Sequence, residues 1–212
     1  TKTSVGGDTV REMMRVAGIG DIAAVEELGD GEFNTAYKVT AAGGCYVVKI
    51  APAPGADVLT YEKNLMATEL AVYDLISRQT DVRVPKVLYR SSAVIGSPWY
   101  VMEYLPGKPL TKARLTRAQR RNVMFELGRS AAKINALTND AFGYMQNGLK
   151  PSWKEAYNDM VSAVLADADR LRVRVPRREK ILRLIGRNAG VLEEVAQARL
   201  IHFDLWKGNI FV

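Results

Sequence analysis

The chain has 212 residues, of which 48% are hydrophobic and 25% are charged, a composition typical of a soluble globular protein. It contains no apolar run of about 18 residues, and its first ten residues lack the apolar core of a secretory signal. We therefore expect a cytoplasmic protein with no membrane partner. The single cysteine, Cys45, excludes an internal disulfide, and its apolar neighbours predict a small buried side chain.

The net charge of +7 is unevenly distributed along the chain. Residues 112–133 contain seven basic side chains and one acid, and residues 170–187 contain eight basic side chains and one acid. Basic segments of this kind either bind nucleic acid or form solvated faces of helices. Because aromatic residues are almost absent from both segments, we favour solvated faces and do not expect nucleic acid binding.

The first half of the chain is predicted to be rich in β-structure. Short segments containing Val and Tyr, separated by Gly and Pro, predict strands at residues 22–28, 35–39, 45–50, 85–89 and 99–104. One helix is predicted at about residues 60–77, because Leu65, Val72, Tyr73 and Ile76 share one face.

After Pro106-Gly107 the pattern becomes helical. Thr116 with Gln119, and Ser152 with Glu155, predict capping boxes that begin two helices. An apolar stripe follows each capping box, and a third helix with its own apolar stripe is predicted further along the chain. We expect each of the three stripes to be a buried face of its helix. The stripes consist of Val123, Leu127, Ala131 and Ile134; of Tyr157, Met160, Val161, Val164, Leu165 and Ala168; and of Ile181, Leu182, Ile185, Leu192 and Val195. Residues 200–212 predict a strand, a loop and a strand.

These elements predict an α+β protein with two lobes. The β-rich N-terminal lobe is expected at residues 1–105 and the helical C-terminal lobe at residues 106–212, with a hinge at about 103–107.

The strongest chemical signal is the segment 202–209, His-Phe-Asp-Leu-Trp-Lys-Gly-Asn. Phosphoryl transfer needs a carboxylate that accepts the proton of the acceptor hydroxyl and a neutral oxygen that helps to hold Mg²⁺. Asp204 and Asn209, five residues apart across a turn, could supply both groups. The only histidine, His202, is expected to fix the loop backbone through hydrogen bonds, with proton transfer as the less favoured role.

This segment resembles the catalytic loop of the aminoglycoside phosphotransferase and choline kinase-like family of small-molecule kinases, which have a protein-kinase-like fold. Protein kinases carry a related His-Arg-Asp loop, in which Phe203 would replace the arginine. The resemblance covers nearly the whole chain. It implies ATP and Mg²⁺ as cofactors, a small-molecule hydroxyl as acceptor, Asp204 and His202 in the catalytic loop, and Asn209 as a metal ligand.

Two segments of the N-terminal half also resemble the family. Residues 28–35 are similar to its nucleotide-covering loop, which would place Gly29, Gly31 and Asn34 near the phosphates. Taken in isolation, the glycines favour a plain hairpin turn. Residues 101–110 resemble the linker between lobes. There the backbone of Glu103, Tyr104 and Leu105 would receive the adenine edge, and Met102 would line its pocket.

Lys49 lies in an apolar segment that resembles the lysine-bearing strand of the family. Burial of a lysine charge in such a strand is unfavourable unless the charge is paired. The expected partners are phosphates and a glutamate of the following helix. Glu62 and Glu69 are both available but lie two helical turns, about 10 Å, apart. The family pattern favours Glu69, which leaves Glu62 as a charge near the start of the helix.

Two departures from the family pattern stand out. Asn135 occupies a position where members often have a histidine, which we expect to affect the support of the loop. The second Mg²⁺ ligand of the family is an aspartate on the strand after the catalytic loop, and this sequence ends at Val212. We therefore expect the C-terminal lobe to be incomplete and the chain to be a fragment.

The function expected from the sequence is transfer of the γ-phosphoryl group of ATP to a hydroxyl of an amino sugar, an aminoglycoside or an amino alcohol. The alternative is a pseudokinase, a module that binds nucleotide without catalysis. A third interpretation, a basic protein that binds nucleic acid through residues 112–133 and 170–187, predicts binding that weakens steeply with salt and ignores ATP.

Overall fold

The computed structural model describes residues 2–29 and 33–212, and the chain divides into two compact units. Unit 1 contains Thr1–Val58, Glu69–Asp74 and Arg83–Gly107. Unit 2 contains Leu59–Thr68, Leu75–Val82 and Lys108–Val212. Helix α2 (Leu65–Gln79) contributes residues to both units, and each unit is described by itself below.

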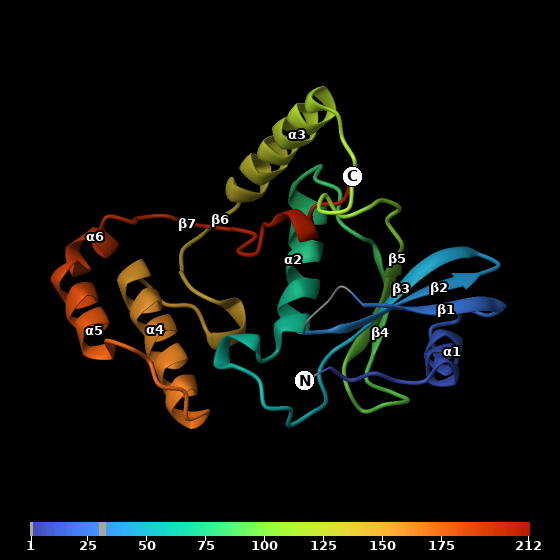
Figure 1. Ribbon diagram of the computed structural model, residues 1–212, viewed down its shortest axis with the longest axis horizontal. Coiled ribbons are helices and arrows are strands. Elements are labelled where there is room, and N and C mark those ends of the chain that lie inside the picture. Colours follow the sequence, from blue (N-terminus) through green and yellow to red (C-terminus); the bar gives the residue numbers. More distant parts are fainter. Residues whose placement is uncertain (1, 30–32) are drawn as a thin grey trace. The chain divides into compact units, whose positions relative to one another are not determined.

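Unit 1 is built on a five-stranded antiparallel sheet with the strand order β1-β2-β3-β5-β4 (Figure 1). All five strands predicted for the first half of the chain are present, and each end lies within two residues of the prediction. The strands are β1 (Ile22–Leu28), β2 (Thr35–Ala41), β3 (Gly44–Ile50), β4 (Val87–Ser91) and β5 (Trp99–Glu103).

The core of unit 1 lies between one face of this sheet and helix α1 (Gly7–Val16), which the sequence analysis did not predict. Val10, Met13 and Met14 of α1 are fully buried, and their spacing is the helical signal that was missed. They pack with alternate residues of the strands, among them Val39 and Val48.

Cys45 is exposed, so the prediction that it would be buried is wrong. It lies at the beginning of β3, next to the turn that joins β2 to β3, and the buried residues of this strand are Val47, Val48 and Ile50 in its second half. An apolar sequence context identified the strand correctly but did not identify which part of the strand the core covers.

Unit 2 is mainly helical. Its principal helices are α3 (Arg117–Asn135), α4 (Trp153–Arg170), α5 (Arg178–Arg187) and α6 (Ala189–Glu193), with a two-stranded sheet formed by β6 (Thr138–Asn139) and β7 (Ala198–Arg199). Three short 3₁₀ helices complete it, η1 (Thr60–Glu62), η2 (Met145–Asn147) and η3 (Lys207–Asn209). Across the described residues 2–29 and 33–212, none of the helices is long and apolar enough to cross a membrane.

Two predicted helices are interrupted. The helix expected at 60–77 is divided into η1 and α2 because Asn64 adopts a left-handed conformation, with φ of 56°. The third helix of the C-terminal half is likewise divided at Asn188 into α5 and α6. The strand, loop and strand expected at residues 200–212 are reduced to η3 and an isolated bridge between Pro109 and Phe211, and the short strand β7 ends just before this segment.

Both predicted helix starts are confirmed. At the start of α3, the backbone N–H of Gln119 donates to Thr116 Oγ1 at 3.3 Å and the N–H of Thr116 donates to Gln119 Oε1 at 3.0 Å, which completes the capping box. At α4, Ser152 Oγ accepts from the backbone N–H of Glu155 at 3.2 Å.

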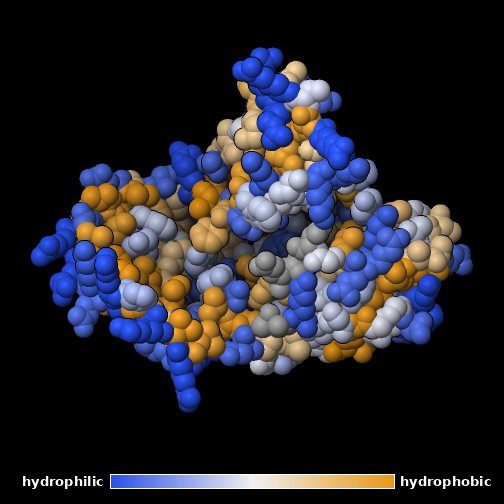
Figure 2. Space-filling model, in the orientation of Figure 1, coloured by the Kyte–Doolittle hydropathy of each residue, from blue (hydrophilic) through white to orange (hydrophobic). Residues whose placement is uncertain are grey.

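The expectation that every apolar stripe is buried is wrong in part. Leu165 of α4 is buried, but Val164, Ile181, Leu182 and Val195 are exposed, and Figure 2 shows apolar side chains at the surface of this region. The stripe of α3 is only half-buried. Periodicity establishes which side chains share a face of a helix, but it does not establish that another element packs on that face.

Candidate functional site

Both ends of the predicted catalytic loop are held by hydrogen bonds to backbone carbonyls within unit 2. Before the loop, the N–H of Leu200 donates to the carbonyl of Leu137 at 2.9 Å, and Arg199 Nη1 donates to the carbonyl of Asn135 at 3.0 Å. After the loop, the N–H of Leu110 donates to the carbonyl of Ile210 at 2.7 Å. The loop therefore begins and ends on fixed backbone.

Within the loop, the structure brings Asp204 and Asn209 together. The side-chain amide of Asn209 donates to the Asp204 carboxylate, Nδ2 to Oδ2, at 2.8 Å and to the Asp204 carbonyl at 2.9 Å. Phe203 has φ of 66°, a left-handed conformation that is strained for a residue with a side chain. A Cβ atom on Gly208 would overlap the ring of Trp206, so the turn between the two polar residues requires glycine there.

The ring of His202 makes no hydrogen bond to any residue that the structure describes, so the expectation that it fixes the loop is not met. Its carbonyl accepts from the Asp204 N–H at 2.8 Å, and Asn209 supplies the side-chain contacts that close the loop. Tyr144 was not predicted from the sequence; its ring meets that of Phe203 edge-on, with 5.4 Å between the ring centroids. No spacing pattern pointed to this contact.

In unit 1, Lys49 and Glu69 form the ion pair expected from the sequence. Lys49 Nζ donates to Glu69 Oε1 at 2.6 Å and to Oε2 at 2.8 Å, with side chains that are 22% and 20% exposed. Lys49 alternates with Val48 and Ile50 along β3, and those neighbours are in the core with α1. The lysine therefore lies on the other face of the sheet, the face that Glu69 of α2 reaches.

Two tyrosines that the sequence analysis did not assign to the site accompany this pair. Tyr73, one helical turn after Glu69, donates from its hydroxyl to Glu69 Oε1 at 2.8 Å. Tyr100 on β5 stands opposite Lys49 in the strand register and is fully buried. Burial, followed by the negative charge of Glu69, raises the pKa of both phenols, so both hydroxyls remain protonated near neutral pH.

Glu62 has a local contact near the start of a helix, as the sequence led us to expect for this residue. Its Oε2 accepts from the backbone N–H of Leu59 at 2.8 Å, at the start of η1 in unit 2. A carboxylate at this position satisfies an N–H that the short helix leaves unpaired. It therefore has a local structural role.

Two N–H groups of the linker segment, those of Leu105 and Gly107, have no acceptor in the described part of the chain. The N–H of Glu103 donates to the carbonyl of Lys86, and that of Tyr104 to the carbonyl of Cys45. Among the three residues predicted to meet the adenine edge, Leu105 is therefore the one whose N–H is available. Met102 is half-buried on β5, and Lys38 Nζ lies 5.0 Å from the centroid of the Tyr104 ring, a cation–π contact.

Only part of the predicted nucleotide-covering loop is described, because Gly31 lies outside the described residues. Gly29 follows β1, and a side chain there would meet no other atom within 4 Å. Asn34 precedes β2, and its Oδ1 atom is buried with no partner among the described residues; the same holds for the hydroxyl of Thr35. The base of this loop thus contains two polar atoms whose hydrogen bonds are unmet.

The predicted catalytic loop contains oxygen atoms of the kind that bind magnesium. Because Asn209 Nδ2 is directed at Asp204, its Oδ1 atom is free of that contact, and the Asp204 carboxylate is exposed. Mg²⁺ takes oxygen ligands and is commonly bound by one or two protein oxygens together with substrate phosphates. The donor set of this loop is of that kind.

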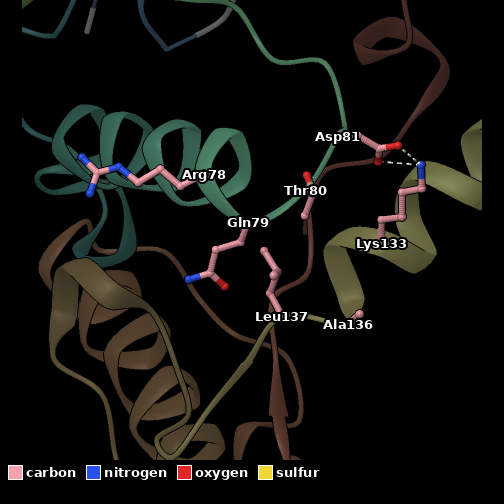
Figure 3. A pocket seen from close by; sticks show the side chains of 7 residues that line it. All are labelled: Arg78, Gln79, Thr80, Asp81, Lys133, Ala136 and Leu137. Atoms are coloured by element: carbon pink, nitrogen blue, oxygen red, sulfur yellow. Dashed lines mark hydrogen bonds and ion pairs between the residues drawn. The ribbon is translucent and has the colours of Figure 1, made fainter.

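An open pocket of about 560 Å³ lies in unit 2 between the end of α2 and α3, and none of the predicted site residues lines it (Figure 3). Its central charges neutralise each other, since Lys133 Nζ donates to Asp81 Oδ1 at 2.6 Å and holds the pKa of that carboxyl below its usual range. Figure 3 shows Arg78 directed away from this pair, along α2.

Comparison with known proteins identifies the family. Residues 24–212 match the model of the phosphotransferase enzyme family. An Arabidopsis thaliana protein named probable acyl-CoA dehydrogenase IBR3 is 27% identical over 138 residues, which are 61% of this chain, and the chain spans 16% of that relative.

Solved structures show the same fold. A predicted fructosamine-3-kinase of Thermobifida fusca YX-ER1 has a TM-score of 0.67 and 22% identity, with 97% of this chain and 70% of that chain covered. Aminoglycoside phosphotransferase APH(4)-Ia has a TM-score of 0.63 and 15% identity, with 98% and 68% covered. These likenesses confirm the α+β, protein-kinase-like fold class expected from the sequence. Because the family model matches most of its length, the chain belongs to the phosphotransferase enzyme family.

Proposed function

We propose that the chain transfers the γ-phosphoryl group of ATP to a hydroxyl of a small molecule. The observation that carries this proposal is the pair formed by Asp204 and Asn209, an exposed carboxylate held by a neutral amide within a loop whose ends are fixed. Lys49, held by Glu69, supplies the cationic group that phosphates need. A thermostable mutant of APH(4)-Ia has been crystallised with AMP-PNP and hygromycin B, which supports nucleotide binding by this fold.

In the proposed mechanism, Asp204 orients the acceptor hydroxyl and accepts its proton as the phosphoryl group is transferred in line. Lys49 neutralises phosphate charge, and the free N–H of Leu105 orients the adenine ring. Asn209 Oδ1 would be a ligand of a magnesium ion, which when bound neutralises charge on the β- and γ-phosphates. We further propose residues 1–105 and 106–212 as the two lobes and the cytoplasm as the location.

The acceptor class proposed first is an amino sugar, an aminoglycoside or an amino alcohol, in keeping with the names of the structural neighbours. The relative named as an acyl-CoA dehydrogenase adds a further class to be tested, the hydroxyacyl thioesters of coenzyme A. Such thioesters carry a hydroxyl and several phosphates. The net basic charge of residues 112–133 and 170–187 is compatible with anionic acceptors of this kind.

The test is the variant Asp204→Asn, which keeps the shape of the side chain and removes its basicity. We expect kcat to fall by at least about 10²-fold, while the affinity for ATP changes little. Phosphoryl transfer is measured on a panel of amino sugars, amino alcohols and hydroxyacyl thioesters, with ATP binding measured by calorimetry. Asp8→Asn, in the first turn of α1, is the matched control and should behave as the wild type. Near-normal turnover by Asp204→Asn would rule out Asp204 as the base.

A second candidate is a nucleotide-binding module without catalysis. The observation in its favour is that Asn209 donates to the Asp204 carboxylate itself and so occupies part of the group that would accept the proton. The same experiment separates the two candidates. A protein that binds ATP but phosphorylates no member of the panel would support the second candidate.

A further inference from the structure

The backbone of the predicted catalytic loop is strained at Phe203, the residue directly before Asp204. The N–H of Asp204 donates to the carbonyl of His202 at 2.8 Å, and Phe203 between them has φ of 66°. This combination is a γ-turn with a positive central φ, a conformation that is rare and strained. Glycine adopts a positive φ readily, whereas a residue with a Cβ atom does so only at a cost in free energy. Strain of this kind is retained where the surrounding structure or the function requires it.

The ring of Phe203 is held on one side by other aromatic residues of unit 2. It meets the ring of Tyr144 edge-on with 5.4 Å between centroids, and the ring of Tyr144 lies 6.0 Å from that of Tyr61. Gln146 Nε2 donates to the carbonyl of Tyr61 at 2.6 Å, which connects η2 with η1. Three segments that are distant in sequence thus contribute to one group of rings beside Asp204.

Packing within unit 2 does not account for this phenylalanine, because most of its surface remains in contact with solvent. Phe203 is 68% exposed. An edge-on contact with Tyr144 covers at most one face of the Phe203 ring. Transfer of an aromatic side chain out of water is favourable, and here most of that gain is not realised. The ring is therefore available to a ligand.

The residues on either side of Asp204 present apolar rather than acidic groups. Ile201 and Leu205 are exposed, as Phe203 is. Asp204 is the only acidic side chain of residues 200–212, and it is assigned to the acceptor hydroxyl. An acceptor with several positive charges needs several carboxylates, which this segment lacks. A hydrocarbon framework, by contrast, gains free energy when it covers exposed apolar side chains.

We propose that Phe203 determines specificity for the acceptor, and that the acceptor hydroxyl at Asp204 is carried by an apolar framework that packs on the open surface of the Phe203 ring. An aromatic or hydrocarbon group fits this surface, whereas an amino sugar with several ammonium groups does not. Because consecutive Cα atoms are about 3.8 Å apart, a molecule whose hydroxyl contacts Asp204 lies within reach of this ring. The inference rests on the proposed function, because it takes Asp204 as the group that meets the acceptor hydroxyl.

The test uses two primary alcohols of equal chain length, phenethyl alcohol and ethanolamine, which differ in carrying a phenyl ring or an ammonium group. Their Kd values are measured by NMR titration, which requires no turnover. The wild type should bind phenethyl alcohol at least about tenfold more tightly than ethanolamine. Phe203→Gly should raise the Kd for phenethyl alcohol about five- to tenfold and leave that for ethanolamine unchanged. Phe203→Tyr keeps the ring and should bind both alcohols as the wild type does.

Two controls separate the effect on binding from effects on stability and from loss of any exposed ring. Phe203→Gly relieves the left-handed strain, so its melting temperature should be equal to that of the wild type or about 2 °C higher. Phe125→Ala removes a ring that is 66% exposed on α3, a similar exposure to that of Phe203. This variant should leave both Kd values unchanged.

Three results would overturn the inference. They are equal affinity of the wild type for the two alcohols, undiminished binding of phenethyl alcohol by Phe203→Gly, and a lower melting temperature of that variant, which would mean that the ring is retained for its packing on Tyr144. Turnover that Asp204→Asn leaves unchanged would contradict the proposed function, and with it this inference. Equal affinity for the two alcohols in a protein that phosphorylates an amino sugar would contradict the inference alone.

Discussion

Lys49 shows how a single residue of this sheet is kept charged and in place. Its neighbours Val48 and Ile50 are in the core, and the lysine on the opposite face is paired with a carboxylate through two short hydrogen bonds. A partly buried ion pair of this kind contributes little net stability, but loss of one partner leaves a charge without compensation. We expect the pair to be retained for its orientation of the ammonium group.

Substitutions of the three residues considered for this pair should have graded effects on ATP binding. Lys49→Ala should raise the Kd for ATP at least about tenfold, because a charge-assisted contact to phosphate is lost. Glu69→Gln should produce a part of that loss, since the amide holds the lysine less firmly. Glu62→Gln should bind as the wild type, because Glu62 contacts only the backbone of Leu59. Calorimetric titration with ATP measures the Kd of each variant. If Glu62→Gln raised the Kd more than the other two substitutions, the predicted order would be wrong.

At the scale of secondary structure, a buried carboxylate connects two elements of unit 2 that are more than one hundred residues apart in sequence. Asp167 of α4 accepts from the backbone N–H of Thr60 at 2.6 Å and from the Thr60 hydroxyl at 3.0 Å, with a side chain that is 6% exposed. Arg170 Nη2 lies 3.1 Å from the same carboxylate. These contacts, with the backbone hydrogen bond first, lower the pKa of Asp167.

Removal of this connection should destabilise the protein. Asp167→Ala leaves the Thr60 N–H without its acceptor and should lower the free energy of unfolding by about 2 kcal/mol at pH 7. Asp169→Ala on the same helix breaks an exposed pair with Arg178 and should have a much smaller effect. Urea denaturation of the three proteins provides the comparison. Equal effects of the two substitutions would mean that the contact with Thr60 contributes nothing.

The stability supplied by Asp167 should depend on pH with a definite sign. Its pKa in the folded protein lies below the unfolded value of about 3.9, so the contribution is fully present above that value. It is lost as the pH falls from about 4 through the lower folded pKa. The difference in stability between the wild type and Asp167→Ala should therefore narrow below about pH 4. A difference that stays constant down to pH 2 would contradict the assigned shift.

At the scale of the whole molecule, burial is unevenly distributed. Val39, Val48 and Val101 on adjacent strands of unit 1 have no exposed surface. Helix α3, all of whose residues are described, has no buried side chain, and Phe125 on it is 66% exposed. The free energy of local unfolding is expected to be lowest where the apolar contacts are fewest.

Hydrogen exchange should report this distribution directly. Backbone amides of β2, β3 and β5 should exchange at least about 100-fold more slowly than those in the middle of α3, because their opening requires disruption of the core of unit 1. Exchange measured by mass spectrometry at neutral pH would show it. The amides at the capping box of α3 serve as an internal reference for end fraying. Equal protection of α3 and the central strands would show that another part of the protein covers this helix.

Several features were accessible from the sequence because they depend on local pattern. The five strands, the helix starts at Thr116 and Ser152, and the choice of Glu69 over Glu62 as the partner of Lys49 are all confirmed. Alternation, capping and helical spacing act over a few residues, so a short stretch of sequence contains them. The roles of the site residues stay predictions.

Other features could not be predicted because they depend on which distant residues meet. The exposure of Cys45 depends on where the core ends along β3, and the exposure of Ile181 and Leu182 depends on what packs against α5. The position of Tyr100 next to the carboxylate of Glu69 depends on the register of β3 and β5. Sequence pattern determined the five strands, the starts of α3 and α4 and the identity of the candidate side chains, and it indicated the family. Tertiary structure alone decided their burial and their partners, because both are set by contacts between segments that are remote in the chain.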